Sequence, residues 1–473
     1  MKTIKILMPV LMPCMILLSC QKFVDIQKSS NQTFITTAND CQLLLDNYTY
    51  MNTGYPVDAE ISADNYYTTA SSYNEGVLPV ITFEEQALHS WQSSAIHAKA
   101  DANWLNPYFI TYNANLVLET IEKIAPGSED PVKINTVKGA ALFYRAYTLW
   151  FVAQMYAKPY STATAAQDPG VPIRLNSDIN TKSSRGTVQD TYNQIISDLS
   201  EAVSLLPAIS SIATRPNKAA AYAMLARTYL SMEDYPNALM NANAAIQIKG
   251  ELLDYNSTMV NKVSNTPFPR YNKEVIFHSV TFRSPILSPG VASTNTAKID
   301  PALVASYAPN DIRSKIFIKP NSGVHAGSYR FTGNYEQAAT SVLFNGLAVD
   351  EIYLTRAECY ARGGDKDNAM ADLNKLLENR WTTGTYIYQS AVTADDALTK
   401  VLEERRKELL MRGLRWTDLR RLNKDNARKK DLTRTITING ITTTYSLPAN
   451  DSRYILLIPQ NVIDNSSIAQ NPR

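Results

Sequence analysis

The sequence predicts a mainly α protein in which stacked helical hairpins support a loop-rich region with little β structure, and three observations lead to this prediction. A segment at 357–374 repeats features of a segment at 226–243, with six identical positions in a gapless alignment. Apolar residues recur at helical spacing over much of the chain, most densely from Lys138 to Tyr156. Two long stretches, 52–98 and 250–348, are instead rich in turn residues.

The repeated segment has the spacing of a tetratricopeptide-type hairpin. In both copies a tyrosine (Tyr229 or Tyr360) stands nine residues before a small alanine (Ala238 or Ala369), with a turn-like segment between them. The tyrosine would fill the hairpin, while the alanine lets the second helix lie close to the first. Such a hairpin cannot bury its apolar face alone, so we expect others to be stacked against it. The alternative is two unrelated amphipathic hairpins that agree by chance.

One body over 20–473 accounts for this pattern. We assign its helical scaffold to 33–51, 99–249 and 349–422, and a loop-rich face to 52–98 and 250–348. Little β structure is expected beyond a small hairpin over Thr435–Tyr445 that turns at Asn439-Gly440. The longest predicted helices are 101–124, 138–156, 188–206, 218–231, 236–248, 349–362, 366–379 and 394–421.

The first twenty residues predict a signal peptide over 1–19. Lys2 and Lys5 precede an apolar run, 6–18, that is too short to span a bilayer. The ending Leu17-Leu18-Ser19-Cys20 resembles a bacterial lipobox, in which the cysteine is acylated and becomes the first residue of the mature protein. An ordinary secretory signal with a chance cysteine is the alternative. No later segment offers 18 consecutive apolar residues, so the sequence predicts no membrane-spanning helix.

Composition and motifs exclude several classes of function. A net charge of +2 gives no sign of a nucleic-acid partner. The four histidines are scattered, and no phosphate-binding, dinucleotide-binding or hydrolase motif is present, so we predict no catalytic residue, no metal and no cofactor. Cys41 and Cys359 fall in predicted helices, where buried free thiols are favoured over a disulfide.

Two charged clusters have alternative interpretations. Asp58, Glu60 and Asp64 are compatible with a catalytic pair or a cation site, although a solvated loop face is favoured. In the basic helix 403–421, Glu403 with Lys407 and Glu408 with Arg412 have the spacing of stabilising ion pairs, which favours a salt-bridged helix over a nucleic-acid surface.

Four stretches carry a family resemblance: 138–147 (KGAALFYRAY), 351–358 (EIYLTRAE), 404–419 (ERRKELLMRGLRWTDL), and Ile458-Pro459-Gln460 with Gln470-Asn471-Pro472. Together with the lipobox they resemble the SusD/RagB family of outer-membrane nutrient-binding lipoproteins of Bacteroidetes. The resemblance covers essentially the whole mature chain. The third stretch is the most specific, and it departs from the family only at Met411, where an aromatic residue is usual.

The resemblance implies about four tetratricopeptide-like hairpins supporting a loop-rich ligand face. It also implies a non-enzymatic, surface-exposed lipoprotein anchored in the outer membrane through Cys20. Its partner would be a TonB-dependent, SusC-like barrel, and its cargo a glycan or, in some members, a peptide. We expect the motif residues Arg405, Glu408, Arg415, Trp416 and Asp418 to form a structural network that holds the last helix to the body.

Ligand residues cannot be transferred by motif, because the family's sites lie in variable loops. Sugars need flat apolar faces and planar polar groups, which both loop regions supply. The alternatives are capture of peptides or another organic ligand, an envelope scaffold without its own ligand, and a glycoside hydrolase. The candidate ligand residues are Asp64, Asn65, Tyr66, Tyr67, Tyr73, Asn74, Trp91, Tyr271, Arg283, Tyr329 and Arg330.

Overall fold

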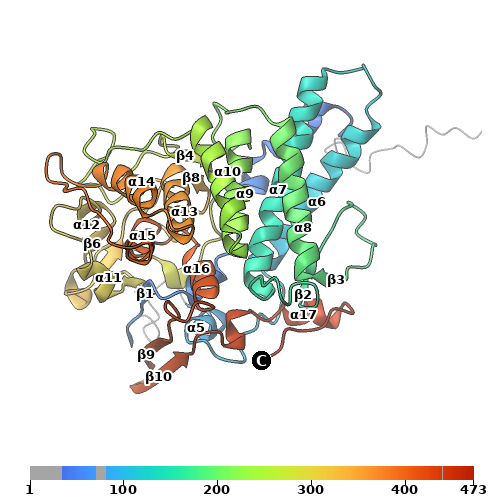
Figure 1. Ribbon diagram of the computed structural model, residues 1–473. Helices are drawn as coiled ribbons and strands as arrows, with labels where there is room; N and C mark the ends of the chain where they lie inside the picture. The colour runs from blue at the N-terminus through green and yellow to red at the C-terminus, as the bar shows by residue number, and fades with distance from the viewer. Residues whose placement is uncertain (1–34, 71–80, 439) are drawn as a thin grey trace, which may run out of the picture.

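The computed structural model in Figure 1 describes residues 35–70, 81–438 and 440–473. Long helices run side by side through the centre and right of the view, and loops with short strands occupy its left and lower parts. The predicted signal peptide and Cys20, as well as Tyr73 and Asn74, lie outside the described residues. Among the helices that are described, none is both long enough and apolar enough to cross a bilayer.

Helices form the scaffold, as predicted. Those that follow one another pack as neighbours: α6 with α7, α7 with α8, α9 with α10, and α13 with α14. Helix α10 also packs on α13, which stacks one hairpin on the next. The scaffold helices are α1 (Ala38–Leu45), α2 (Tyr48–Met51), α6 (Ala102–Lys123), α7 (Pro131–Tyr156), α8 (Val188–Leu205), α9 (Lys218–Met232), α10 (Tyr235–Ile248), α13 (Val349–Arg362), α14 (Lys366–Glu378), α15 (Ala394–Glu408) and α16 (Arg415–Leu422).

The structure explains the repeat found in the sequence. Its two copies form the hairpins α9–α10 and α13–α14, and the repeated alanines are fully buried between helices. The repeated Asp and Asn cap the second helix: Asp234 accepts from the backbone N–H of Asn237, and Asp365 accepts in the same way from Asn368. The six shared positions therefore encode close packing and a helix start. Cys359 of α13, a free and buried thiol, packs with Leu230 of α9 and Ala238 of α10.

The predicted helix 394–421 is wrong, because the chain breaks after Glu408 and helix resumes only at Arg415. Met411 and Gly413 have positive φ angles of 58° and 74°, which an α-helix cannot contain. Lys407 and Arg412, the basic residues of the two predicted ion pairs, have other partners. Lys407 pairs with Glu404 rather than Glu403, and Arg412 reaches Asp350 at 3.2 Å instead of Glu408.

The motif residues form the predicted network. Arg405 donates to Asp418 at 2.9 Å, and Arg415 donates to Asp64 at 2.6 Å. The Trp416 ring lies 4.6 Å from that of Tyr454. The first contact joins α15 to α16, and the second joins α16 to the loop region 52–98, so the network holds the loop-rich face against the scaffold.

The loop-rich regions contain short elements: α3 (Asp58–Ser62), β1 (Tyr66–Tyr67), α5 (Phe83–His89), β4 (Val275–Phe277), η2 (Pro285–Leu287), β5 (Lys298–Ile299), α11 (Pro301–Ala305), α12 (Arg313–Ile316), β6 (Ile318–Pro320), η3 (Gly323–His325), β7 (Tyr329–Phe331) and β8 (Leu347–Ala348). Four more short elements lie outside these regions: β2 (Pro169–Pro172), β3 (Arg185–Thr187), η4 (Ser452–Tyr454) and α17 (Gln460–Asp464).

An antiparallel sheet of strand order β1-β5-β7-β6 unites the two loop regions. Tyr66 of the first region lies opposite Ile299 of the second. The strand pairs β2–β3 and β4–β8 form two separate two-stranded sheets. Strands β9 (Leu432–Ile438) and β10 (Ile441–Leu447) form the predicted hairpin at the lower edge of Figure 1, three residues longer toward Leu432 than expected.

Candidate functional site

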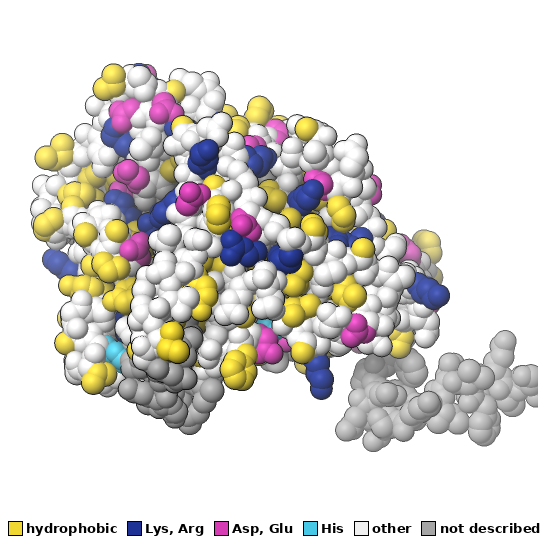
Figure 2. All heavy atoms as spheres, turned by 90° about the horizontal axis from the view of Figure 1, so that it is seen from below, with side chains coloured by type: hydrophobic (Ala, Val, Ile, Leu, Met, Phe, Trp, Pro, Cys, Tyr) yellow, Lys and Arg dark blue, Asp and Glu magenta, His cyan; other side chains and the backbone are white. Residues whose placement is uncertain are grey.

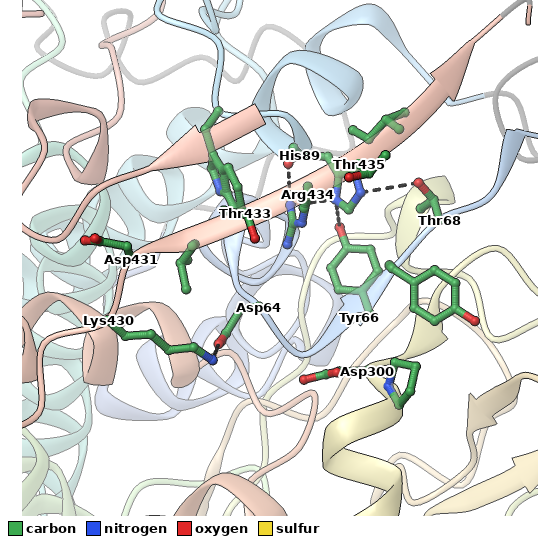
Figure 3. A pocket seen from close by; sticks show the side chains of 15 residues that line it. Asp64, Tyr66, Thr68, His89, Asp300, Lys430, Asp431, Thr433, Arg434 and Thr435 are labelled. Atoms are coloured by element: carbon green, nitrogen blue, oxygen red, sulfur yellow. Dashed lines mark hydrogen bonds and ion pairs between the residues drawn. The ribbon is translucent and has the colours of Figure 1, made fainter. Parts of the chain in front are cut away.

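A pocket opens where three distant parts of the chain meet, beside the start of the β9–β10 hairpin (Figure 3). Strand β1 and helix α5 line one side, the start of α11 a second, and strand β9 a third. Its volume is about 350 Å³, within the usual range for a small-ligand site. The lining residues are Asp64, Tyr66, Tyr67, Thr68, His89, Trp91, Asp300, Pro301 and 430–436.

Asp64 connects the pocket to the last helices. Its carboxylate accepts hydrogen bonds from Arg415 Nε at 2.6 Å and from Lys430 Nζ at 2.8 Å. Arg406 donates to the Asp64 carbonyl oxygen and to the Asp300 carboxylate, each at 2.9 Å. Burial disfavours a charged carboxylate, but the three cations hold the pKa of Asp64 well below its usual range. Asp64 is therefore ionised and fixed, and two arginines of the signature stretch position this wall of the pocket.

Two aromatic side chains of the pocket are covered by Arg434 of β9. Its guanidinium carbon lies 4.4 Å from the ring centre of Trp91 and 5.4 Å from that of Tyr66. These two rings are only 4% and 3% exposed. Burial and the charge of Arg434 hold the pKa of His89 well below its usual range, so its neutral imidazole hydrogen-bonds the Tyr66 hydroxyl at 3.1 Å. The contacts of Arg434 with Trp91, Tyr66 and His89 hold the hairpin against the body. Because the two rings are covered, they expose little surface to a ligand.

The accessible side chains of the pocket are mostly polar, in contrast to the buried rings of Trp91 and Tyr66. Tyr67 is half-buried, and its hydroxyl lies close to Ser328. Asp431, Thr433 and Thr435 are exposed along the start of the hairpin. One aromatic side chain, two hydroxyls and a carboxylate thus line the same pocket, which suits a small polar ligand with an apolar side.

The structure brings only some of the eleven predicted ligand residues together at this pocket. Four line this pocket: Asp64, Tyr66, Tyr67 and Trp91. Asn65 is buried behind them, where its side chain accepts from Arg406 at 3.4 Å.

Four more predicted residues that the structure describes are not part of the pocket lining. Tyr329 and Arg330 are on β7, in the same sheet as β1, but Arg330 is buried and donates to Asn265 at 3.0 Å. Tyr271 instead packs against His278, with 4.8 Å between ring centres, and Arg283 is exposed elsewhere. The role of each as a ligand contact stays a prediction.

Sequence reasoning missed the contribution of 430–436 to this pocket. The hairpin itself is readable from the Asn439-Gly440 turn and the flanking alternation. Nothing in that pattern says that β9 packs beside a strand more than 360 residues earlier in the chain, because the contact is purely tertiary.

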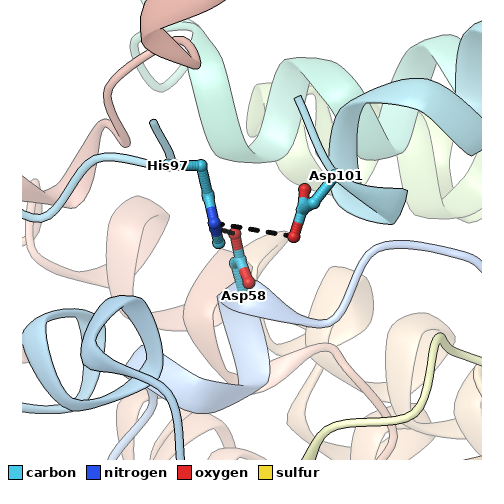
Figure 4. Close-up of side chains that lie close together, drawn as sticks. All are labelled: Asp58, His97 and Asp101. Atoms are coloured by element: carbon cyan, nitrogen blue, oxygen red, sulfur yellow. Dashed lines mark hydrogen bonds and ion pairs between the residues drawn. The ribbon is translucent and has the colours of Figure 1, made fainter. Parts of the chain in front are cut away.

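The carboxylates Asp58, Glu60 and Asp64 do not form a solvated face, as the sequence suggested, since all three are nearly buried. Asp58 is only 1% exposed and pairs with His97 Nε2 at 2.8 Å (Figure 4). Glu60 accepts from the backbone N–H of Gly413 at 3.0 Å, and burial raises its pKa to about 7. The loop folds over these groups, so each is bound by a different part of the protein.

Asp58, His97 and Asp101 form the one cluster of metal-ligand type within the described ranges. The two carboxylates approach different ring nitrogens: Asp58 lies 2.8 Å from Nε2 and Asp101 lies 3.6 Å from Nδ1. A metal ion would need one nitrogen lone pair and both carboxylates on the same side. The arrangement fits a charged imidazolium held between two carboxylates, which clips the segment before α6 onto α3 (Figure 4).

Replacing His97 by glutamine should remove part of the pH dependence of stability. Burial opposes the charged imidazolium, but Asp58 raises the pKa of His97 from 6.5 to about 9. The ion pair therefore stabilises the fold fully below about pH 6.5, and this contribution, on the order of 2–3 kcal/mol, is lost as the pH rises through about 9.

Urea unfolding of the wild type and of His97→Gln between pH 6 and 10 measures this effect. The difference between the two proteins cancels other titrations, such as that of Lys298, whose burial lowers its pKa to about 8. We expect the difference to shrink with rising pH. A difference in unfolding free energy that stays constant over this pH range would contradict an ion pair between protonated His97 and Asp58.

The face of the molecule seen from below in Figure 1 has a mixed surface. Figure 2 shows basic and acidic side chains interspersed among hydrophobic ones there, without a broad field of one sign on the part of the chain that is described. Such a surface does not select strongly for a charged ligand.

Two family models match the chain. One, of the SusD-like group and described as "Starch-binding associating with outer membrane", matches residues 22–230. The other, described as "SusD family", matches residues 349–473. The chain belongs to the SusD/RagB family. Members of the SusD/RagB family are binding proteins rather than enzymes, which agrees with the prediction of a non-catalytic chain.

Solved structures of SusD-like proteins share the fold. A SusD superfamily protein from Bacteroides thetaiotaomicron is 22% identical, with a TM-score of 0.72 over 92% of this chain and 100% of its own. A SusD-like carbohydrate binding protein from Bacteroides vulgatus is 17% identical, with a TM-score of 0.66 over 92% and 97%. A laminarin binding SusD-like protein is 17% identical, with a TM-score of 0.65 over 93% and 100%. No curated protein matches the chain.

Proposed function

We propose that the chain is a cell-surface lipoprotein that captures oligosaccharide or polysaccharide nutrients and delivers them to a SusC-like, TonB-dependent barrel in the outer membrane. Cys20 is its lipid anchor, and the regions 52–98 and 250–348 form its ligand face. Membership of a carbohydrate-binding family supports the class of ligand. The laminarin binding relative and the starch-binding description of the family model supply the first glycans to test.

The observation that carries the proposal is the convergence of three chain segments on one pocket with sugar-compatible groups. A sugar ring presents C–H groups on one side and hydroxyls around its edge, so it needs an apolar surface beside hydrogen-bonding groups. Tyr67 supplies the apolar surface, and Asp431, Thr433 and Thr435 supply the polar groups. Asp64 and Asp300 are held by arginines, so they shape the wall without needing a metal or another partner.

Replacing Tyr67 by alanine should weaken glycan binding about tenfold or more, because the pocket loses its accessible aromatic side chain. The measurement is calorimetric titration of the Gln21–Arg473 fragment with malto- and laminari-oligosaccharides. Tyr388→Ala is the matched control, since Tyr388 is an exposed tyrosine outside this pocket. Both variants should melt at the temperature of the wild type.

An unchanged affinity in Tyr67→Ala would argue against this pocket. A second cavity of about 620 Å³ lies between α6, the loop 174–183 and α17, with Tyr108 and Tyr112 on its wall. Loss of binding in Tyr112→Ala together with normal binding in Tyr67→Ala would place the site there instead. Binding of peptides, with no glycan bound, would favour the peptide-capture alternative.

A further inference from the structure

One face of the β9–β10 hairpin consists entirely of hydroxyl side chains. Residues directly opposite in an antiparallel pair point to the same face, and alternate residues point to opposite faces. The register pairs Thr433 with Ser446, Thr435 with Thr444, and Thr437 with Thr442. The hydroxyl oxygens are 3.2 Å apart in the second pair and 2.9 Å apart in the third. We call these six residues the hydroxyl face.

The other face of the hairpin has a different composition and a different environment. It carries Leu432, Arg434 and Ile436 on β9, all of which are buried against the body. It carries Thr443 and Tyr445 on β10. The hydroxyl face is not packed in this way: five of its six residues are exposed, and Thr437 is half-buried.

Strand propensity alone does not account for the hydroxyl face. Threonine suits any strand position, yet five of the six threonines of the two strands are on this one face. Edge strands usually carry charged side chains, especially lysine, which discourage pairing with other chains. The six positions carry none. An uncharged surface that is rich in donors and acceptors, with threonine methyl groups between them, matches a neutral polyhydroxylated chain better than a charged or purely apolar partner.

The hydroxyl face is continuous with the pocket, because Thr433 and Thr435 belong to both (Figure 3). Resting on the proposed function, we propose that the hydroxyl face is an extended subsite along which a neutral oligosaccharide continues after its first sugars have entered the pocket. The pocket holds only a short piece of glycan, while the hydroxyl face extends beyond the pocket lining by one further cross-strand pair, Thr437 with Thr442. The chain thereby selects for length: longer oligosaccharides bind more tightly than shorter ones of the same linkage.

Thr→Val substitutions test this without disturbing the strand, because valine keeps the β-branched shape and removes only the hydroxyl. The test variant is Thr437→Val with Thr442→Val, the cross-strand pair outside the pocket lining. Thr443→Val is the matched control, since it makes the same change on the other face of the same hairpin. The probes are maltotriose and maltoheptaose, and the corresponding laminari-oligosaccharides, titrated into the protein purified in detergent.

For the wild type we expect the heptasaccharide to bind more tightly than the trisaccharide. The test variant should weaken the heptasaccharide about tenfold and leave the trisaccharide unchanged, while Thr443→Val changes neither. Thr444→Val serves as a second variant, and the melting temperature checks that each protein is folded.

Equal affinity of the wild type for both lengths, or an unchanged heptasaccharide affinity in both hydroxyl-face variants, would overturn the extended subsite while leaving glycan capture intact. Wild-type protein that binds neither length in either series, yet binds peptides, would overturn the proposed function and the subsite with it.

Discussion

Replacing Arg380 by methionine is expected to lower the free energy of unfolding by about 3–5 kcal/mol. Arg380 is fully buried and donates to Glu408 at 2.7 Å and to Glu274 at 2.8 Å, with its guanidinium carbon 3.9 Å from the ring centre of Tyr255. Without the arginine, two buried carboxylates lose their shared partner. The effect is large because Glu274 lies in the loop-rich region 250–348 and Glu408 in the scaffold helix α15, so the contact joins the two parts.

Urea unfolding near neutral pH measures this loss of stability. Two further variants serve as comparisons: one removes the unpaired charge, and the other removes an exposed ion pair. Adding Glu274→Gln to Arg380→Met should recover part of the stability, since burial already raises the pKa of Glu274 to about 7 and a neutral amide removes the unpaired charge. Lys366→Ala removes an exposed ion pair with Asp367 and should cost less than about 1 kcal/mol. An Arg380→Met loss as small as that of Lys366→Ala would show that the buried network contributes little.

Replacing Cys20 by alanine is expected to release the protein from the membrane almost completely. The Leu17-Leu18-Ser19-Cys20 ending resembles a lipobox, and no described helix offers another way to span a bilayer. Each buried methylene of an acyl chain contributes about 0.8 kcal/mol, so several chains anchor a protein durably and their loss is decisive.

Membrane fractionation with labelling by a radioactive fatty acid measures the anchor. Cys14→Ala is the matched control, because Cys14 lies within the same apolar run but is followed by Met15 instead of ending the lipobox. It should remain labelled and membrane-bound. Continued attachment of Cys20→Ala, or release of Cys14→Ala, would contradict the assignment of Cys20 as the acylated residue.

Features encoded locally were predictable from the sequence. The α9–α10 and α13–α14 hairpins are visible because small alanines and an Asp cap recur at fixed spacing, and both signals act within one hairpin. The β9–β10 hairpin is visible for a similar reason, since its turn and its alternation are adjacent in sequence.

Features that depend on tertiary contacts were not predictable. The break after Glu408 accompanies the buried pairing of Arg412 with Asp350, a tertiary contact that helical periodicity cannot reveal. Strand β1 is two residues long and carries no period of its own, so its pairing with β5 was invisible. For the same reason the sequence suggested that Trp91 was available to a ligand, although Arg434 from the far end of the chain covers its ring.

Calorimetric titration of the Gln21–Arg473 fragment against a panel of glycans and peptides tests the central claim most directly. The proposed function predicts a saturable heat with one class of neutral oligosaccharide, and loss of most of that heat in Tyr67→Ala. Saturable binding of peptides, with no heat from any glycan in the panel, would contradict it.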